Sequence, residues 1–326
     1  MLTRLFPDRF VLILLATIIA ASVVPVRGTA VGAAQTVATA AIVLLFFLNG
    51  VRLPWQEVFA AARNLRLIGA ALGFCFLAMP AIGWLLYRLS EPLLPHLIAL
   101  GFLYCGILPS TVQSAAGATG MAKSDVAASV VLAALLNLVG VVLSPLLFAL
   151  LDGRAAVVNG DAETRIILIL LLPFVLGQLA RRWFKDAVAA RPVLVRSLDR
   201  GAIAIAVYVA FSGAVVGGLW DRLSATDIAV ICAGIALFLA LAYGGAWLLG
   251  GHIGLALPQR ASLMFAGAQK SIAVGAPLAA TLFTPATAGM VLVVILGYHM
   301  AQLMVAAWLA PHIAARVEAK SSVLVE

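Results

Sequence analysis

Residues 263–277 read LMFAGAQKSIAVGAP, and this stretch decides how the whole chain is interpreted. Its ends are apolar, and its middle is interrupted by Gly267, Gln269, Lys270, Ser271 and Gly275. A broken helix in a lipid bilayer leaves backbone N–H and C=O groups that only protein or a water-filled cavity can satisfy. The stretch therefore predicts an interrupted membrane helix beside a polar site.

A similar interruption lies in the first half of the chain, at residues 106–120, which read GILPSTVQSAAGATG. Gln113 and Gln269 mark the two breaks and lie 156 positions apart, close to half of the 326 residues. Interrupted apolar segments at matching positions in two halves are a sequence signature of a transporter's binding site.

The composition indicates a polytopic membrane protein. Hydrophobic residues make up 64% of the chain and charged residues only 10%, whereas a soluble domain carries about 25% charged residues. The net charge of +8 does not indicate nucleic-acid binding, because the basic residues fall in short links between apolar runs. The three cysteines lie inside apolar runs without metal-ligand spacing and are expected to be buried apolar side chains.

Ten apolar runs are long enough to span a bilayer, which takes about 20 helical residues. The expected spans are approximately 10–25, 30–51, 66–87, 93–121, 126–151, 165–184, 201–219, 226–249, 259–283 and 286–312. The fourth and ninth contain the two breaks. The first run also resembles a signal peptide, but its length and the many spans after it favour a membrane helix. The basic stretch at 181–200 is expected to be a link.

With ten spans and a cytoplasmic N-terminus, fifteen Lys and Arg residues fall on the cytoplasmic side and five on the other. This bias follows the positive-inside rule and places both termini in the cytoplasm, with the chain in the plasma (inner) membrane. Five spans per half is an odd number, so the second half is inverted. We expect one transmembrane domain, 1–326, made of a first repeat, 1–151, and a second, inverted repeat, 152–326.

Catalytic motifs are absent from the sequence. All thirteen acidic residues fall in links, tails or span edges of this map, and there is neither a His-Glu-x-x-His zinc motif nor a P-loop. The sequence therefore predicts neither an enzyme nor a metal centre.

Lys270 is the one formal charge expected deep in the bilayer, where a lysine costs about 3 kcal/mol. Three functional interpretations follow: it binds an anionic substrate, it titrates during transport, or it stands where a coupling cation would bind. The structural alternatives are that it caps free carbonyls at a half-helix end or snorkels to the cytoplasm.

Neutral polar side chains accompany Lys270 at the two breaks, where they are candidates for binding a substrate or an ion: Ser110, Thr111, Gln113, Ser114, Gln269 and Ser271. Half-helix N-termini would add partial positive charge suited to an anion. Ser129 and Asn137 lie eight positions apart and share a helix face that could meet the first break. His299 and Gln302 have the related place in the second half. The alternative for all of them is hydrogen bonding within the protein.

Three segments carry a family resemblance: LPSTVQSA, KSDVAASV and FAGAQKSIAVGAPLA. They resemble the bile acid:sodium symporter family, and within it the bacterial relatives of sodium/bile acid cotransporter 7. The resemblance implies ten helices in two inverted five-helix repeats, arranged as a panel domain and a core domain. It also implies that broken helices four and nine cross in the core, and that transport proceeds by alternating access.

The family's sodium ligands are matched only in part. Residues 111–114 resemble its Thr-x-Ser-Asn run, and Ser129 and Gln269 match its serine and glutamine. Ala133 stands where a threonine is expected, Phe265 where a glutamate is expected, and Lys270 replaces the following asparagine. The chain thus loses an anionic ligand and gains a cation relative to the family pattern.

The sequence therefore predicts a secondary active transporter that moves an organic, anionic solute across the lipid bilayer, with sodium as one option for the coupling ion. The alternatives are a proton-coupled or sodium-independent exporter, and a non-transporting membrane protein that regulates a partner. No cofactor besides sodium and no nucleic acid is expected. A homodimer is one option for the assembly.

Overall fold

The computed structural model describes residues 9–52, 64–152 and 162–323, and all regular structure in these ranges is helical. The helices in chain order are α2 (Arg9–Val23), α3 (Ala30–Arg52), α5 (Leu65–Gly73), η1 (Phe74–Ala78), α6 (Met79–Ser90), α7 (His96–Ile107), α8 (Val112–Met121), α9 (Val126–Asp152), α10 (Ala162–Ile166), η3 (Ile167–Leu171), α11 (Leu172–Ala189), α12 (Pro192–Val216), α13 (Leu219–Arg222), α14 (Ala225–His252), α15 (Leu257–Ala268), α16 (Ile272–Leu282) and α17 (Pro285–Val323). The predicted breaks in the fourth and ninth spans are both present, between α7 and α8 and between α15 and α16.

Seven helical segments of the described chain are long and apolar enough to cross a membrane, and an eighth is obtained when α7 and α8 count as one span bent by 67°. The protein is therefore a multi-span membrane protein. The predicted total of ten spans stays a prediction, because α2 is shorter than the others and α15 with α16 does not meet the same test. The ends of the chain and the basic residues Arg4, Arg63 and Arg154 of the charge count lie outside the described residues.

The prediction that residues 181–200 form a link between helices is wrong. Helix α11 continues to Ala189 and α12 begins at Pro192, so only a short turn separates them. Alanine, arginine and lysine are strong helix formers, and proline suits the first position of a helix. Charge density in this stretch marks helix ends that leave the apolar layer, rather than an irregular loop.

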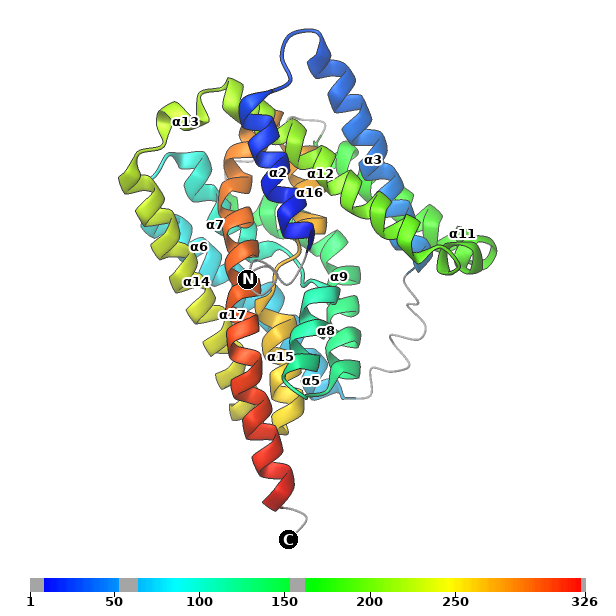
Figure 1. Cartoon of the computed structure of the whole chain (residues 1–326), viewed down its shortest axis with the longest axis vertical. Helices are drawn as coiled ribbons and strands as arrows, with labels where there is room; N and C mark the ends of the chain where they lie inside the picture. The colour runs from blue at the N-terminus through cyan, green and yellow to red at the C-terminus, as the bar shows by residue number, and fades with distance from the viewer. Residues whose placement is uncertain (1–8, 53–63, 153–161, 324–326) are drawn as a thin grey trace.

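Helices α2, α3, α11 and α12, called here the small bundle, pack on one another and run obliquely to most of the others (Figure 1). The large bundle contains α5 to α9 and α14 to α17, and α12 joins the two bundles by packing on α16 and α17. Glycines allow close approach in the small bundle: a Cβ on Gly50 would lie 2.2 Å from the Phe174 carbonyl oxygen. Small residues at helix contacts are typical of membrane bundles.

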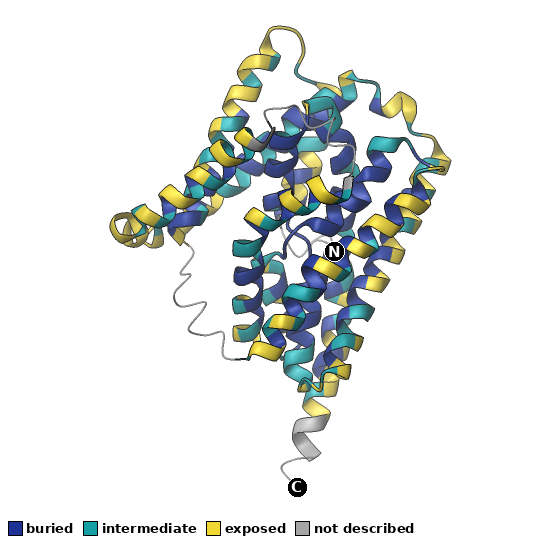
Figure 2. Cartoon of the chain, turned by 180° about the vertical axis from the view of Figure 1, so that it is seen from behind, coloured by how far each residue is buried: buried dark blue, intermediate teal, exposed yellow. Residues whose placement is uncertain are grey.

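Burial follows the layout expected in a bilayer. Buried residues gather on the inward faces of the helices, and exposed ones cover their outer faces (Figure 2). Many exposed side chains are large and apolar, including Leu77 at 73%, Leu150 at 77% and Trp308 at 64% exposed. Such a surface is costly in water and suited to lipid.

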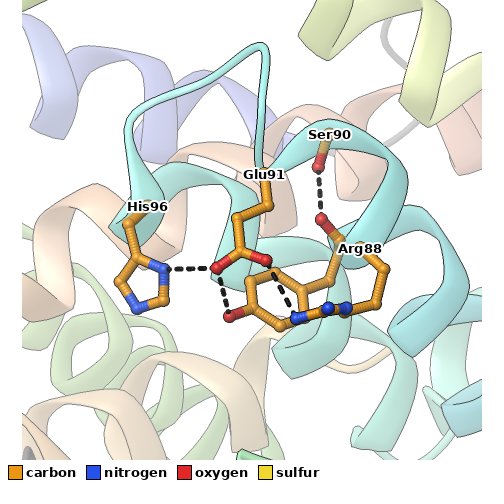
Figure 3. A network of polar contacts seen from close by, with 5 residues as sticks. Arg88, Ser90, Glu91 and His96 are labelled. Carbon is orange, nitrogen blue, oxygen red and sulfur yellow. Dashed lines mark hydrogen bonds and ion pairs between the residues drawn. The ribbon is translucent and has the colours of Figure 1, made fainter.

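A polar network closes the corner between α6 and α7 (Figure 3). Glu91 accepts hydrogen bonds from Arg88 at 3.1 Å and from the Tyr87 hydroxyl at 3.2 Å, and the His96 Nδ1 lies 3.5 Å from its carboxylate. His96 begins α7, whereas the break lies at the other end, about 16 Å away at 1.5 Å per residue. The network therefore fixes the corner without belonging to the break.

Candidate functional site

The first break follows from its proline. Helix α7 ends at Ile107, and Leu108 turns to an extended backbone with ψ 147°. A proline such as Pro109 disfavours helical geometry in the residue before it and supplies no N–H of its own. The chain resumes as α8 at Val112, with Thr111 in the N-cap position but making no side-chain cap.

The carbonyl oxygens freed at this break are all satisfied by other elements. Ile107 accepts from the Ser144 hydroxyl at 2.7 Å, Pro109 from the Ser271 backbone N–H at 2.9 Å, and Ser110 from the Asn137 amide at 2.7 Å. Gly106 and Leu108 accept from Lys270, whose ammonium lies 2.9 Å and 2.7 Å from their oxygens. Two of these donors come from the second break, so the two unwound segments meet.

The second break contains no proline and is stabilised by Gln302 of α17. Helix α15 ends at Ala268, and α16 begins at Ile272. The Gln302 Oε1 accepts from the Lys270 backbone N–H at 2.7 Å, and its Nε2 donates to the Lys270 carbonyl at 3.0 Å. The side-chain amide thus replaces the hydrogen bonds that a continuous helix would give this peptide. The Tyr298 hydroxyl donates to the Ala268 carbonyl at 2.7 Å.

The same amide sets the tautomer of a neutral His299 imidazole. Because a backbone N–H can only donate, Oε1 of Gln302 must face Lys270, and its Nε2 then faces the His299 Nδ1 at 2.8 Å. An amide nitrogen can only donate, so Nδ1 accepts and the ring proton of the neutral imidazole sits on Nε2. A second proton on Nδ1 would break this hydrogen bond.

Lys270 is 1% exposed. Besides the two carbonyls, its ammonium contacts the Cys75 sulfur at 3.8 Å, so each of its three N–H groups has an acceptor. No carboxylate pairs with it in the part of the chain that the structure describes. The alternative in which Lys270 caps free carbonyls is confirmed, and the one in which it snorkels to the cytoplasm is wrong.

A cavity of about 1110 Å³ lies between the two bundles, next to both breaks. Of the predicted site residues, six line it: Thr111, Gln113, Ser114, Asn137, Ser271 and His299. The other four do not: Ser110, Ser129, Gln269 and Lys270. Lys270 therefore faces the crossing of the two breaks and is not part of the cavity lining.

Several buried polar groups beside the breaks have no hydrogen-bond partner within the described residues. They are the hydroxyls of Ser110, Ser114 and Ser129 and both polar atoms of the Gln269 amide, although the Tyr243 hydroxyl lies near this amide. Buried polar groups are normally satisfied by protein, water or a bound ligand. Their clustering marks the crossing as a polar site in an apolar protein.

Charged residues of the small bundle line the cavity, and several of them are exposed. We call this set the mouth of the cavity, and sequence reasoning did not connect it with the breaks. Five are basic and two acidic: Arg52, Arg181, Lys185, Arg196, Arg200, Asp186 and Asp199. Arg52 and Asp199 form an ion pair at 2.6 Å. The excess of positive charge favours an anion in the cavity.

Two helix N-termini add to this positive potential. Helices α8 and α16 both begin at the cavity, with Val112 and Ile272 among its lining residues. Neither Thr111 nor Ser271, the N-cap residues, forms a side-chain cap. The first N–H groups of a helix lack intrahelical partners and carry partial positive charge, and such N-termini bind anions.

Comparisons with known proteins agree with this architecture. The sequence profile of the SBF-like CPA transporter family (DUF4137) matches residues 8–315. The chain is 34% identical to "Uncharacterized protein PA2026" of Pseudomonas aeruginosa over 325 residues, which cover 99% of this chain and 98% of that one. It is 35% identical to "Putative symporter YfeH" of Escherichia coli over 304 residues, covering 93% and 92%.

A more distant relative is "Sodium/bile acid cotransporter 7" of Mus musculus, which is 25% identical over 284 residues, covering 85% of this chain and 83% of that one. The resemblance seen in the motifs at the two breaks is thereby confirmed across most of the chain. This protein belongs to the SBF-like CPA transporter family and is a membrane transporter.

Proposed function

We propose that the protein is a secondary active transporter that moves an organic anion across the plasma membrane of the cell by alternating access. The observation that carries this proposal is the cavity at which two uncapped helix N-termini and five basic side chains converge. Its lining also includes apolar side chains such as Phe46, Val131 and Phe174. A solute with an acidic group and an apolar body fits both kinds of surface.

The proposed architecture is ten helices in two inverted repeats, 1–151 and 152–326. In this scheme the small bundle corresponds to the panel and the large bundle to the core. The basic mouth of the cavity lies on the side that the positive-inside rule assigns to the cytoplasm. The structure would then be an inward-facing state with both termini in the cytoplasm, and access from the other side requires the bundles to shift.

Counterflow in proteoliposomes tests the transport proposal. The purified protein is reconstituted and offered radiolabelled taurocholate and a panel of smaller carboxylates and sulfonates, each beside its neutral amide. We expect accelerated exchange of at least one anion and none of its neutral partner. Acceleration of neither, or of both equally, would contradict the proposal. Stable capture of a protein partner without any flux would instead favour a regulatory role.

Charge variants test whether the basic residues of the cavity contribute to anion transport. Replacing Arg196 by Gln in the cavity mouth should raise the half-saturating concentration of the transported anion several-fold, because it removes positive potential from the route. Arg222→Gln is the matched control, since Arg222 in α13 does not line the cavity, and it should leave the half-saturating concentration unchanged. Exchanging sodium for potassium on both sides identifies whether sodium is the coupling ion.

A further inference from the structure

The carbonyl oxygens that hold Lys270 form a cradle of the kind that binds a monovalent cation. Gly106 lies in the last turn of α7 and Leu108 is the C-cap residue directly after it, where the helix dipole places partial negative charge. Their oxygens lie 2.9 Å and 2.7 Å from the Lys270 Nζ. Unwound carbonyls and half-helix C-termini coordinate cations in membrane transporters.

The third contact of this cradle comes from a different element. Cys75 lies on the π-helical turn Phe74–Ala78 and is fully buried. Its sulfur lies 3.8 Å from the Lys270 Nζ and 3.8 Å from the Leu108 carbonyl oxygen. Single π-helical turns inside α-helices often occur at functional sites. The turn closes the cradle over the ammonium, so that all of its surroundings are protein.

The charge of Lys270 is offset by dipoles rather than by an acidic partner. Burial of a cation is costly unless nearby groups stabilise it, and the described residues offer carbonyls and a sulfur in place of a carboxylate. The backbone of Lys270 is held separately by Gln302. The break therefore keeps its shape through one set of contacts, and the ammonium fills the cradle through another.

We propose that the Lys270 ammonium is a tethered cation that permanently occupies a monovalent-cation site at the crossing of the two breaks, so that no free cation is needed at this position. This inference rests on the proposed transport function only where it concerns the ion requirement of transport. The occupancy itself is a property of the folded chain. Removing the side chain while leaving its space should convert the cradle into a site for a free cation.

Thermal unfolding of the detergent-purified protein tests this directly. Wild type, Lys270→Ala and Lys270→Met are compared in sodium, potassium, methylammonium and choline chlorides at equal ionic strength. Relative to wild type, Lys270→Ala should gain about 1–2 °C in sodium or methylammonium over choline, as expected for a cation at a few times its dissociation constant. Lys270→Met should gain nothing, because its uncharged side chain fills the same space.

A neighbouring substitution separates this effect from ordinary loss of a hydrogen bond. Ser144→Ala removes the donor to the Ile107 carbonyl in the same break and leaves Lys270 in place. It should lower the melting temperature by the same amount in every salt. Should Lys270→Ala be recovered folded only with sodium or methylammonium, the proposal is equally supported.

The proposal is overturned if Lys270→Ala responds to the four salts as wild type does, or if it is recovered folded in none of them. A gain by Lys270→Met equal to that of Lys270→Ala would also overturn it. In the counterflow assay, Lys270→Ala should acquire a dependence on methylammonium that wild type lacks, whichever ion the wild type couples to transport. Absence of flux from wild type would count against the transport function alone, since the unfolding experiment still decides the role of Lys270.

Discussion

Gln302 shows how a single side chain can stand in for a missing turn of helix. It pairs with both the N–H and the C=O of Lys270 and also donates to His299. The residue is fully buried, so water cannot replace it. The geometry of the second break therefore depends on one amide that is distant in sequence.

Replacing Gln302 by Leu should destabilise the protein by at least about 2 kcal/mol, because it leaves two buried backbone groups of Lys270 unsatisfied. The measurement is thermal or denaturant unfolding in detergent. Gln113→Leu is the matched control: Gln113 is exposed at the cavity, and its loss should change anion flux with little effect on stability. Equal stability losses in the two variants would contradict this account.

The sequence shows which residue types gather at the crossing, but not which groups they contact. Capping of carbonyls by Lys270 was one alternative among several, and its acceptors lie more than 160 positions away. Tyr104 and Tyr298 were not predicted as part of the site. Their hydroxyls donate to the carbonyls of Gly275 and Ala268. Their position inside apolar runs, away from the span ends where tyrosine is common, is the signal that could have found them.

At the scale of elements, the N-terminus of α8 is a positive end without a side-chain cap. Thr111→Asp and Thr111→Asn would both supply a capping oxygen to this helix, but only the aspartate brings negative charge to the cavity. Thr111→Asp should raise the half-saturating concentration of a transported anion about tenfold over Thr111→Asn, equivalent to about 1.4 kcal/mol. Counterflow measures this difference. Identical values for the two variants would exclude the N-terminus from anion binding.

The contact between α3 and α11 depends on the absence of a side chain. A Cβ on Gly50 would meet the Phe174 carbonyl oxygen at 2.2 Å, whereas one on Gly32 of the same helix would meet nothing within 4 Å. Gly50→Ala should cost about 1–3 kcal/mol through overpacking against backbone. Gly32→Ala should be neutral or slightly stabilising. The unfolding midpoints of the two variants in detergent test this difference. Equal shifts of the two midpoints would contradict the predicted role of Gly50.

The elements were predictable to the extent that they follow local chemistry. Pro109 and the polar residues after it predict the first break. In the second break, the polar and glycine residues predict the interruption. Its position at Lys270 is stabilised by the Gln302 side chain of α17, which the sequence pattern does not reveal. The prediction of a link at 181–200 was wrong because the charges in this stretch were interpreted as a loop. The helix-forming residues continue α11 to Ala189, and Pro192 begins α12.

At the scale of the molecule, the cavity lies between two bundles that share one hydrophobic core and are joined where α12 packs on α16 and α17. The basic residues of its mouth belong to α3, α11 and α12, and the helix N-termini belong to the large bundle. Sequence alone identified the breaks, but could not show that these basic residues face them, because the faces of α11 and α12 are set by packing between distant segments.

Alternating access requires the small and large bundles to move relative to one another. Thr39 of α3 and Thr284, which precedes α17, line a second pocket of about 260 Å³ between the bundles. A short bismaleimide bridging Thr39→Cys and Thr284→Cys, in a background without Cys75, Cys105 and Cys232, should therefore abolish counterflow, and a cleavable linker should restore it on reduction.

The control is a bridge within one bundle. Phe47 of α3 and Phe184 of α11 have ring centroids 6.4 Å apart, and both belong to the small bundle. Cross-linking Phe47→Cys to Phe184→Cys should leave flux intact, because a rigid-body motion does not change distances inside the moving body. If the bridge between Thr39 and Thr284 leaves flux unchanged at full cross-linking, the bundles do not move apart there, and access to the solute must follow another route.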